Sequence, residues 1–140
     1  MRVVGIDLGT RRVGVAVSDA TGTLASPHAV LQRSGDRTTD HRRLADLVAE
    51  LGAERVVVGL PLSLDGGTGP AARAAAEEAE ALGAVVGVPV ETFDERLTTV
   101  SAQQALRAGG TRARKQRGVI DKAAAAVLLQ AWLDGGGTGR

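Results

Sequence analysis

The sequence predicts an α/β fold, built on a mixed five-stranded sheet with helices on both faces. Two apolar segments with alternating side chains open the chain, and a short basic turn, Thr10-Arg11-Arg12, joins them, which is typical of an antiparallel strand pair. A continuous apolar run at 55–61 is expected to be a central strand of a parallel sheet, covered on both faces. Helix-length segments flank this run, so we expect the later strands to be parallel and joined by right-handed crossovers.

The first three strands are expected to form a meander at about 2–9, 13–18 and 23–31. The turn residues Asp19-Ala20-Thr21-Gly22 separate the second strand from the third, because Asp and Gly favour tight turns. Pro27 interrupts the third strand and indicates an edge position, since proline cannot donate a hydrogen bond to a neighbouring strand. With strand one in the centre, the expected strand order is 3-2-1-4-5.

A polar linker at 32–38 leads into the first helix. Thr39 or Asp40 is expected to be its N-cap and Gly52 to end it, because short polar residues favour helix starts and glycine favours helix ends. The apolar side of this helix, which is expected to pack on the sheet, consists of Leu44, Leu47, Val48 and Leu51.

The second half of the chain is expected to continue the parallel part of the sheet. A Gly-rich loop at 62–69 precedes a helix from Pro70 to Gly83, and a short strand follows at about 85–93. The remaining elements are expected to be helices at about 98–108 and 119–134, a basic loop between them at 110–118, and a flexible Gly-rich tail at 135–140. We therefore expect a single domain over 1–134.

The composition excludes several classes of protein. The 140 residues contain no cysteine, which rules out disulfides, thiolate zinc sites and cysteine nucleophiles. The net charge is only +1, which argues against a protein that coats nucleic acid non-specifically. Phe93 and Trp132 are the only aromatic residues, so recognition by stacking of successive bases is not expected. Without an apolar run of membrane-spanning length or a signal peptide, we expect a cytoplasmic protein with no membrane partner.

Asp7 is the most informative residue of the first strand. Strict alternation places it on the same face as Val3 and Gly5, opposite to Ile6. A carboxylate in an apolar strand is costly to bury unless a cation or hydrogen-bond donors meet it. Because Gly5 and Gly9 flank it without side chains, a metal ion or a phosphate is expected to approach the backbone there. An Asp that caps a turn at the end of a strand is the simpler alternative.

Three further acids qualify by position as partners of Asp7. Asp94 and Glu95 follow the last strand, and Asp121 falls in the first turn of the expected final helix, where the helix dipole favours its charge. The carboxyl ends of parallel strands meet at one edge of the sheet, which is where ligands of such sheets bind. Each acid also has a simpler interpretation, as a helix-start acid beside a basic neighbour.

A set of carboxylates at one edge would suit Mg²⁺ or Mn²⁺, which prefer oxygen ligands. Two such ions can activate a water molecule and stabilise the leaving oxygen in phosphodiester hydrolysis. No histidine is needed, and His28 and His41 are expected to lie away from this edge. The basic loop at 110–118 could bind phosphates, or it could simply be a solvated connector between two helices. The basic residues that could hold nucleic-acid phosphates are Arg11, Arg12, Arg96, Arg114, Lys115 and Arg117.

Four motifs, which span nearly the whole chain, resemble the YqgF family, also called RuvX, whose members are bacterial Holliday-junction-resolvase-like proteins of the RNase H fold. The motif that begins at Asp94 is the most specific of them. The motifs are Gly5-Ile6-Asp7-Leu8-Gly9-Thr10-Arg11-Arg12-Val13-Gly14-Val15-Ala16-Val17-Ser18-Asp19, Val57-Val58-Gly59-Leu60-Pro61-Leu62 with Asp65-Gly66, Asp94-Glu95-Arg96-Leu97-Thr98-Thr99, and Val119-Ile120-Asp121-Lys122-Ala123-Ala124-Ala125.

The resemblance implies a role for each acid. By motif, Asp7 corresponds to the metal ligand of the first strand, Asp121 to the acid of the last helix, and Asp94 or Glu95 to the middle acid. Better-known nucleases of this fold usually carry an acid at the end of the fourth strand, where this chain has Gly59-Leu60-Pro61. The family supplies that acid from the end of the following strand. Glu95 is preferred because a side chain there must reach back across strands spaced about 4.8 Å apart.

The resemblance also implies an activity, a metal-dependent nuclease that uses Mg²⁺ or Mn²⁺. The family is assigned to 5′-end maturation of the 16S ribosomal RNA precursor, and some members are linked to branched DNA. A non-catalytic RNA-binding assembly factor on the same fold is a further alternative, and the protein could be a monomer or a homodimer. The opening motif is also similar to the first phosphate motif of Hsp70- and hexokinase-type ATPases, but those proteins clamp nucleotide between two related domains, and 140 residues supply one.

Overall fold

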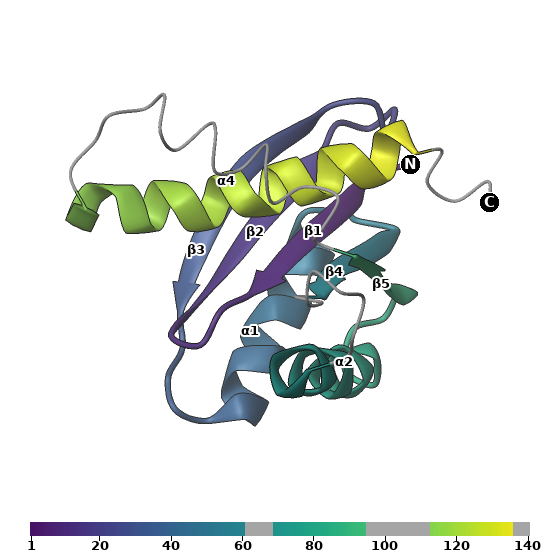
Figure 1. The fold of residues 1–140 in the computed structure, drawn as a ribbon. Helices are drawn as coiled ribbons and strands as arrows, with labels where there is room; N and C mark the ends of the chain where they lie inside the picture. Colours follow the sequence, from purple (N-terminus) through teal and green to yellow (C-terminus); the bar gives the residue numbers. More distant parts are fainter. Residues whose placement is uncertain (61–68, 95–112, 136–140) are drawn as a thin grey trace.

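This computed structural model describes residues 1–60, 69–94 and 113–135, and within 113–122 it describes the backbone alone. In this part of the chain, five strands form a mixed sheet in the order β3-β2-β1-β4-β5 (Figure 1). The first strand pairs antiparallel with the second and parallel with the fourth, so the expected topology is confirmed. The strands are β1 Val3–Leu8, β2 Arg12–Ser18, β3 Ala25–Gln32, β4 Arg55–Leu60 and β5 Val90–Asp94.

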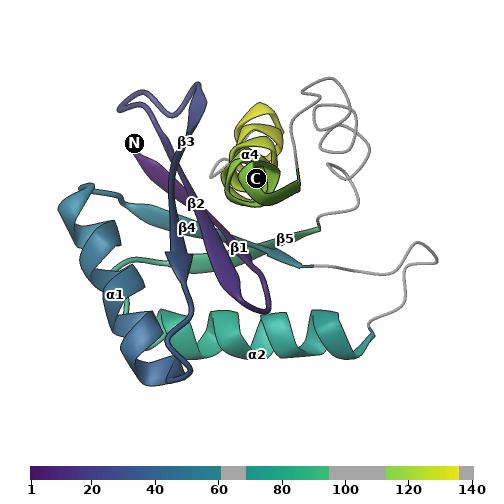
Figure 2. The same ribbon diagram turned by 90° about the vertical axis from the view of Figure 1, so that its left-hand side faces the viewer.

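Helices cover both faces of the sheet, as expected. The helices are α1 Arg37–Glu50, α2 Pro70–Gly83 and α4 Ala113–Asp134. Figure 2 shows α4 on one face and α1 with α2 on the opposite face. Gly52 follows α1 with a φ of 68°, a conformation that favours glycine and ends the helix where the sequence predicted. Of the described helices, none combines the length and the apolar character that crossing a bilayer requires.

Alternation along β1 divides the buried residues into two layers. Val4 and Ile6 belong to a cluster that includes Leu44 of α1 and Leu82 of α2. Val3 belongs to a second cluster, on the α4 side, that also contains Ala16, Val57, Ala125, Leu129 and Trp132. The sheet is therefore buried on both faces, as the apolar run of β4 predicted.

The last helix begins earlier than the sequence predicted. It starts at Ala113 rather than at 119, so the backbone of most of the expected basic loop is helical. The physical reason is that Arg, Lys, Gln and Ala are all strong helix formers, and one interior glycine at position 118 costs only about 1 kcal/mol. The Gly-rich loop up to residue 68, the helix expected at 98–108 and the tail from 136 lie outside the described residues.

The first helix also begins earlier than expected. It starts at Arg37, with Asp36 rather than Thr39 or Asp40 at the N-cap position. The carboxylate of Asp40 has a different partner, because it accepts a hydrogen bond from the backbone N–H of Ser34 at 3.0 Å. This contact ties the linker to the first turn of α1.

The two edge strands differ from regular strands for separate reasons. The last strand is shorter than expected, because the backbone N–H of Val86 donates to the carbonyl of Leu82 at 2.9 Å and so continues the final turn of α2. In β3 the register with β2 shifts at His28, next to Pro27. This irregularity is a β-bulge, and it fits the edge position that the proline predicted.

Candidate active site

Asp7 lies near the carboxyl end of the central strand, on the face that α4 covers. It pairs with Gly14 of β2 across the antiparallel ladder. Alternation puts it on the side of Val3, which packs in the α4 layer. The residue is partly exposed, so a ligand at this edge of the sheet can reach it, and ligands of such sheets bind beyond the carboxyl ends of the strands.

Gly5 is the point at which α4 crosses β1. A Cβ atom at this position would lie 2.8 Å from the Cβ of Leu129 and 3.2 Å from the carbonyl oxygen of Ala125. At Gly9 a Cβ atom would collide with the carbonyl oxygen of Arg12 in the same turn. The missing side chains of these two glycines therefore make room for a helix and for the turn itself, and the approach of a metal ion or a phosphate at this edge stays a prediction.

The last helix runs toward the carboxyl end of β1. Figure 1 shows the amino-terminal half of α4 on the side of the sheet toward which the β1 arrow points. Asp121 precedes Ala125 by about one helical turn, so its backbone position lies on the side of α4 that meets Gly5. Asp121 is not in the first turn of the helix, which begins at Ala113. The expected support from the helix dipole is therefore lost, because it acts only within the first turn.

Asp94 lies on the opposite face of the sheet from Asp7. It is the last residue of β5 and pairs with Leu60, whereas its neighbour Phe93 packs in the α4 layer. Because neighbouring residues of a strand alternate in direction, Asp94 belongs to the face of α1 and α2. Glu95, the preferred middle acid, lies outside the described residues.

The three-carboxylate metal site stays a prediction. Among the described side chains, no group of three or more His, Asp or Glu residues is placed to hold a metal ion. The side chains of Glu95 and Asp121 are not part of that set. Of the preferred ligands, Asp7 alone has a described side chain, and the backbone of α4 brings the position of Asp121 to the same face.

The predicted phosphate-binding residues occupy two places in the described chain. Arg11 is exposed in the turn between β1 and β2, and Arg12 begins β2 and is partly exposed. Their role in binding stays a prediction. The others are Arg96, which lies outside the described residues, and Arg114, Lys115 and Arg117, whose backbone lies in the amino-terminal turns of α4 rather than in a loop.

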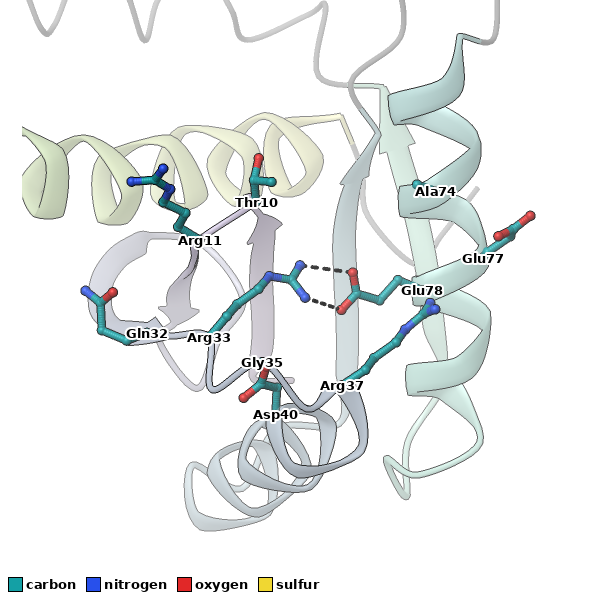
Figure 3. Close-up of a pocket in the computed structure, with 10 residues that line it drawn as sticks. All are labelled: Thr10, Arg11, Gln32, Arg33, Gly35, Arg37, Asp40, Ala74, Glu77 and Glu78. Atoms are coloured by element: carbon teal, nitrogen blue, oxygen red, sulfur yellow. Dashed lines mark hydrogen bonds and ion pairs between the residues drawn. The ribbon is translucent and has the colours of Figure 1, made fainter.

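A groove of about 610 Å³ opens beneath the β1–β2 turn, among residues of the turn, the linker, α1 and α2 (Figure 3). Its charges balance, with three arginines and three acids. Figure 3 shows the guanidinium of Arg33 facing the carboxylate of Glu78 across it. The groove is therefore no purely basic phosphate cradle, and the helices beside it cover the face opposite to Asp7. Its lining consists of Thr10, Arg11, Gln32, Arg33, Gly35, Arg37, Asp40, Ala74, Glu77 and Glu78.

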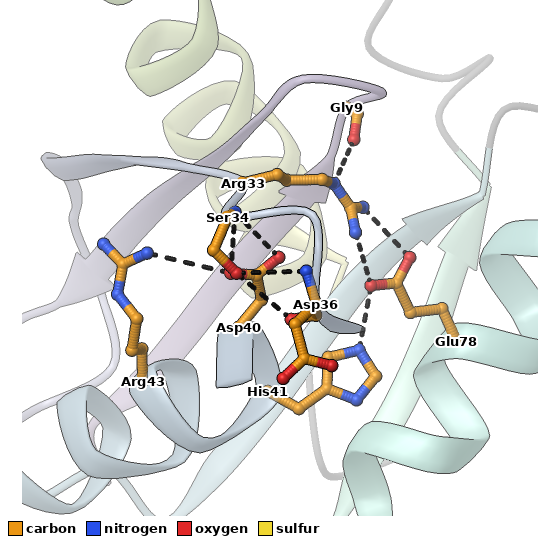
Figure 4. A network of polar contacts seen from close by, with 8 residues as sticks. All are labelled: Gly9, Arg33, Ser34, Asp36, Asp40, His41, Arg43 and Glu78. Carbon is orange, nitrogen blue, oxygen red and sulfur yellow. Dashed lines mark hydrogen bonds and ion pairs between the residues drawn. The ribbon is translucent and has the colours of Figure 1, made fainter. Parts of the chain in front are cut away.

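A network of polar side chains, among them the buried Asp40, His41 and Glu78, underlies this groove (Figure 4). Glu78 of α2 accepts hydrogen bonds from the Arg33 guanidinium at 2.8 and 3.0 Å and from His41 Nε2 at 2.8 Å. The Nε of Arg33 donates to the carbonyl oxygen of Gly9 at 2.8 Å. His41 is linked to the turn after β1 through Glu78 and Arg33, and its expected position away from the carboxylate edge stays a prediction.

The carboxylates of this network are held in their ionised form. Burial of Glu78 opposes its charge, but the hydrogen bonds from Arg33 and His41 outweigh burial and lower its pKa. Burial likewise opposes the charge of Asp40, and the hydrogen bond from Ser34 together with nearby arginines lowers its pKa. In return, the hydrogen bond to Glu78 raises the pKa of Arg33.

Sequence reasoning missed this network, although the helix pattern carried a signal for it. Glu78 lies on the buried side of α2 together with Ala75 and Leu82. His41 likewise lies on the buried side of α1 with Leu44. A charged or polar residue at a core position of an amphipathic helix needs a partner, and this rule could have singled out both residues.

Comparison with known proteins gives a family and close relatives. The model of the family described as "RuvX: Holliday junction resolvase" matches residues 1–135. A "Putative pre-16S rRNA nuclease" of Mycobacterium leprae (strain Br4923) is 56% identical over 135 residues, which cover 95% of this chain and 72% of the relative. Proteins of the same name from Mycobacterium sp. (strain KMS) and Leifsonia xyli subsp. xyli (strain CTCB07) are 54% and 50% identical, over 95% and 94% of this chain and 79% and 84% of the relatives.

Solved structures support the fold. RuvC of Thermus thermophilus in complex with a Holliday junction substrate has a TM-score of 0.57 at 20% identity and covers 96% of this chain and 94% of that chain. A second Thermus thermophilus RuvC structure has a TM-score of 0.56 at 18% identity. At these identities the likeness shows the fold alone, and it confirms the RNase H-like fold expected from the sequence. With the family match over 1–135 and relatives at 50–56% identity, the chain belongs to the RuvX family.

Proposed function

We propose that this chain is a metal-dependent endonuclease that matures the 5′ end of the 16S ribosomal RNA precursor. The observation that carries the proposal is the position of Asp7, partly exposed near the carboxyl end of the central strand and on the face that α4 covers. The names of relatives at 50–56% identity support the ribosomal RNA precursor as the substrate.

Asp7, Glu95 and Asp121 are the proposed metal ligands, with Asp94 as the alternative to Glu95. The donor set fits Mg²⁺ or Mn²⁺, because it consists of carboxylates and the sequence contains no cysteine. When bound, such ions activate a water molecule and stabilise the leaving oxygen of a phosphodiester. Glu95 is the better candidate, because Asp94 lies on the face of the sheet opposite to Asp7.

The chain's own basic side chains would hold and orient the substrate. Arg11 is exposed in the turn that follows the strand of Asp7, and a guanidinium can bind a phosphate through two hydrogen bonds and fix its orientation. Such contacts position the nucleic-acid backbone without reading its sequence. The residues proposed to hold flanking phosphates are Arg12, Arg96, Arg114, Lys115 and Arg117.

The test compares the wild-type protein with Asp7→Asn on a 16S precursor fragment that carries its 5′ extension, in Mg²⁺ and in Mn²⁺. Asn keeps the size of the side chain and removes its charge. We expect cleavage to fall at least about 100-fold, because changes beyond the ligands of a metal site already cost about 10- to 100-fold. Asp46→Asn, on the exposed side of α1, is the matched control and should cleave like wild type. Equal cleavage by Asp7→Asn and wild type would contradict the proposal.

Cleavage of branched DNA is the second candidate function, and the description of the matching family favours it. A four-way DNA junction is therefore tested beside the RNA under the same conditions. Faster cleavage of the junction would replace the RNA precursor by branched DNA as the substrate. If the protein binds RNA tightly and cleaves neither substrate, it is a non-catalytic RNA-binding assembly factor.

A further inference from the structure

Arg33 holds both sides of the turn between β1 and β2. Its backbone N–H donates to the carbonyl oxygen of Arg11 at 2.9 Å, and its side-chain Nε donates to the carbonyl oxygen of Gly9 at 2.8 Å (Figure 4). Gly9 directly follows β1, and Arg11 directly precedes β2. The linker after β3 therefore fixes the turn from outside the hairpin.

The guanidinium of Arg33 is itself fixed, because Glu78 binds it through two parallel hydrogen bonds of 2.8 and 3.0 Å. His41 holds the same carboxylate at 2.8 Å. The side chains are largely buried, with exposed fractions of 20% for Arg33, 11% for Glu78 and 4% for His41. A two-bond pair of this kind defines an orientation as well as a distance, so the Nε of Arg33 is aimed at Gly9.

Stability alone does not explain this arrangement. Apolar residues of similar size in place of a buried ion pair often leave a protein equally stable or make it more stable. The pair lies between the aliphatic cluster of this face, to which Ala79 and Leu82 of α2 belong, and the charged groove beneath the turn. Such a pair can contribute a fixed orientation rather than stability, and the hydrogen bond of Arg33 to Gly9 indicates that the segment it orients is the β1–β2 turn.

The turn that Arg33 fixes connects residues of the candidate active site. Asp7 lies two residues before Gly9, and Arg11 lies within the turn. The turn is tight, since a Cβ atom at Gly9 would collide with the carbonyl oxygen of Arg12. A tight turn has few ways to deform, so a displacement at Gly9 is passed on to its neighbours along the chain.

We propose that Arg33 is a positioning residue: its clamp to Glu78 fixes the β1–β2 turn, and the turn holds the candidate site in place for phosphodiester cleavage. Through the turn, Arg33 sets the positions of Asp7 and Arg11. It acts through the backbone of the turn rather than through contact with the substrate. This inference rests on the proposed nuclease function.

Arg33→Lys tests the proposal. Lysine keeps the positive charge but lacks the planar fork, so it cannot bind both oxygens of Glu78 and the carbonyl of Gly9 together. We expect kcat to fall about 10- to 100-fold with KM little changed, because small misplacements of reacting groups cost rates of this size. We also expect hydrogen exchange of the backbone amides at 10–12 to become at least about tenfold faster, as local opening becomes easier.

Arg55→Lys is the matched control. Arg55 forms an ion pair with Glu91 at 2.7 Å and has a similar exposed fraction of 26%, but it lies opposite Val3, at the other end of β1. This variant should leave kcat and the exchange at 10–12 unchanged, even where it lowers Tm as much as Arg33→Lys does. Equal losses of kcat in the two variants at equal Tm would show a merely structural role and overturn the proposal.

A second variant and the exchange measurement keep the outcomes separate. If Arg33→Lys does not fold, Glu78→Gln removes the charge that clamps Arg33 and should give the same two changes, whereas wild-type values in that variant would overturn the proposal. If Asp7→Asn is inactive and Arg33→Lys cleaves like wild type, the positioning role alone fails. If the wild type cleaves no substrate, the nuclease proposal fails, and unchanged exchange at 10–12 in Arg33→Lys would reject the clamp as well.

Discussion

The two faces of the sheet are packed in different ways, although β1 contributes to both. On the face of α1 and α2, the fully buried side chains of Val4 and Ile6 pack in a large aliphatic cluster. On the face of α4, Gly5 leaves room for the helix itself, whose backbone at Ala125 and side chain at Leu129 come close to the strand. On the first face, β1 contacts the helices through its side chains. On the second face, α4 packs directly against the backbone of β1 at Gly5.

The difference between the two faces comes from Gly5, which contributes no side chain to the α4 face. A glycine inside a strand costs conformational entropy and contributes no side chain to the core. Here it lets α4 approach β1 beside Asp7 and brings the backbone of the helix that carries Asp121 to the same face. The face with the close helix approach therefore carries the candidate active site, while the face with the larger aliphatic cluster carries the network proposed to fix its turn.

Shortening one buried leucine on each face should give the largest effect. Leu82 of α2 and Leu129 of α4 are both fully buried, so Leu82→Ala and Leu129→Ala should each lower the free energy of unfolding by about 2–5 kcal/mol. Leu129→Ala should slow cleavage more than Leu82→Ala at a temperature at which both variants are folded, because it loosens α4 against β1 directly beside Asp7. Urea unfolding measures the stability, with the single tryptophan, Trp132, as the fluorescent reporter.

Each of these two variants serves as the control for the other, because both remove the same atoms from a buried leucine. Equal losses of cleavage activity in folded Leu82→Ala and Leu129→Ala would mean that both faces support the site alike. The distinction drawn between the two faces would then be wrong.

Adding one methyl group to the α4 face should have the next largest effect. Gly5→Ala places a Cβ atom 2.8 Å from the Cβ of Leu129, a contact that forces α4 and β1 apart. We expect the free energy of unfolding to fall by about 1–3 kcal/mol, the usual cost of overpacking, together with a loss of cleavage activity. Gly87→Ala is the control, because nothing lies within 4 Å of a Cβ atom there, and it should change stability by no more than about 0.5 kcal/mol. Wild-type stability in Gly5→Ala would contradict the close approach.

Removing the charge of Glu78 should change the pH dependence of stability. Its pKa is lower in the folded protein than its ordinary value of 4.5, so the unfolded chain binds this proton more tightly. The stabilisation is therefore fully present above that value and is lost as the pH falls through the lowered pKa. As the pH falls below 4.5, the free energy of unfolding should therefore fall more steeply in wild type than in Glu78→Gln.

An exposed residue on the same helix provides the control for this measurement. Glu80→Gln changes an exposed carboxylate of α2 and should follow the wild-type slope in acid unfolding. If Glu78→Gln and wild type show the same slope, the Arg33 clamp does not hold the carboxylate of Glu78 in its ionised form.

The topology could be predicted from the sequence because local patterns determine it. Alternation in β1 predicted an antiparallel pair, and the continuous apolar run of β4 predicted a parallel strand beside it. Together they indicate a mixed sheet, and the confirmed order β3-β2-β1-β4-β5 follows from them. Gly52 likewise marked the end of α1, because its φ of 68° favours glycine over other residues. These signals depend on a few neighbouring residues, so no long-range contact had to be known.

The atoms that meet in space could not be predicted in the same way. Gly5 signals a close approach, but the sequence does not say whether a ligand or a helix approaches it. The pairing of Arg33 with Glu78 joins the linker to α2, and nothing local in the linker distinguishes this arginine from its neighbours. The run from Arg114 to Arg117 was expected to lie in a loop between two helices, although its residues favour helix and α4 includes them.

The smallest effect is expected in the turn from β2 to β3, at the end of the hairpin opposite to Gly9. Asp19 accepts hydrogen bonds there from the hydroxyl of Thr21 at 2.5 Å and from the backbone N–H groups of Thr23 at 2.8 Å and Leu24 at 3.1 Å. These bonds, that of Thr21 foremost, lower the pKa of Asp19 to about 2. A carboxyl titration by NMR should give this midpoint, and Thr21→Val should move it up toward the ordinary value of 3.8.

This turn separates local hydrogen bonding from the packing of either face. Asp19 is exposed, and the stabilisation from its lowered pKa is present above 3.8 and lost as the pH falls toward 2, so Thr21→Val should leave cleavage at neutral pH unchanged. A midpoint near 3.8 in the wild type would show that the turn does not hold the carboxylate. A loss of cleavage in Thr21→Val would be more serious, because it would mean that the site depends on the far end of the meander as well as on the turn that Arg33 fixes.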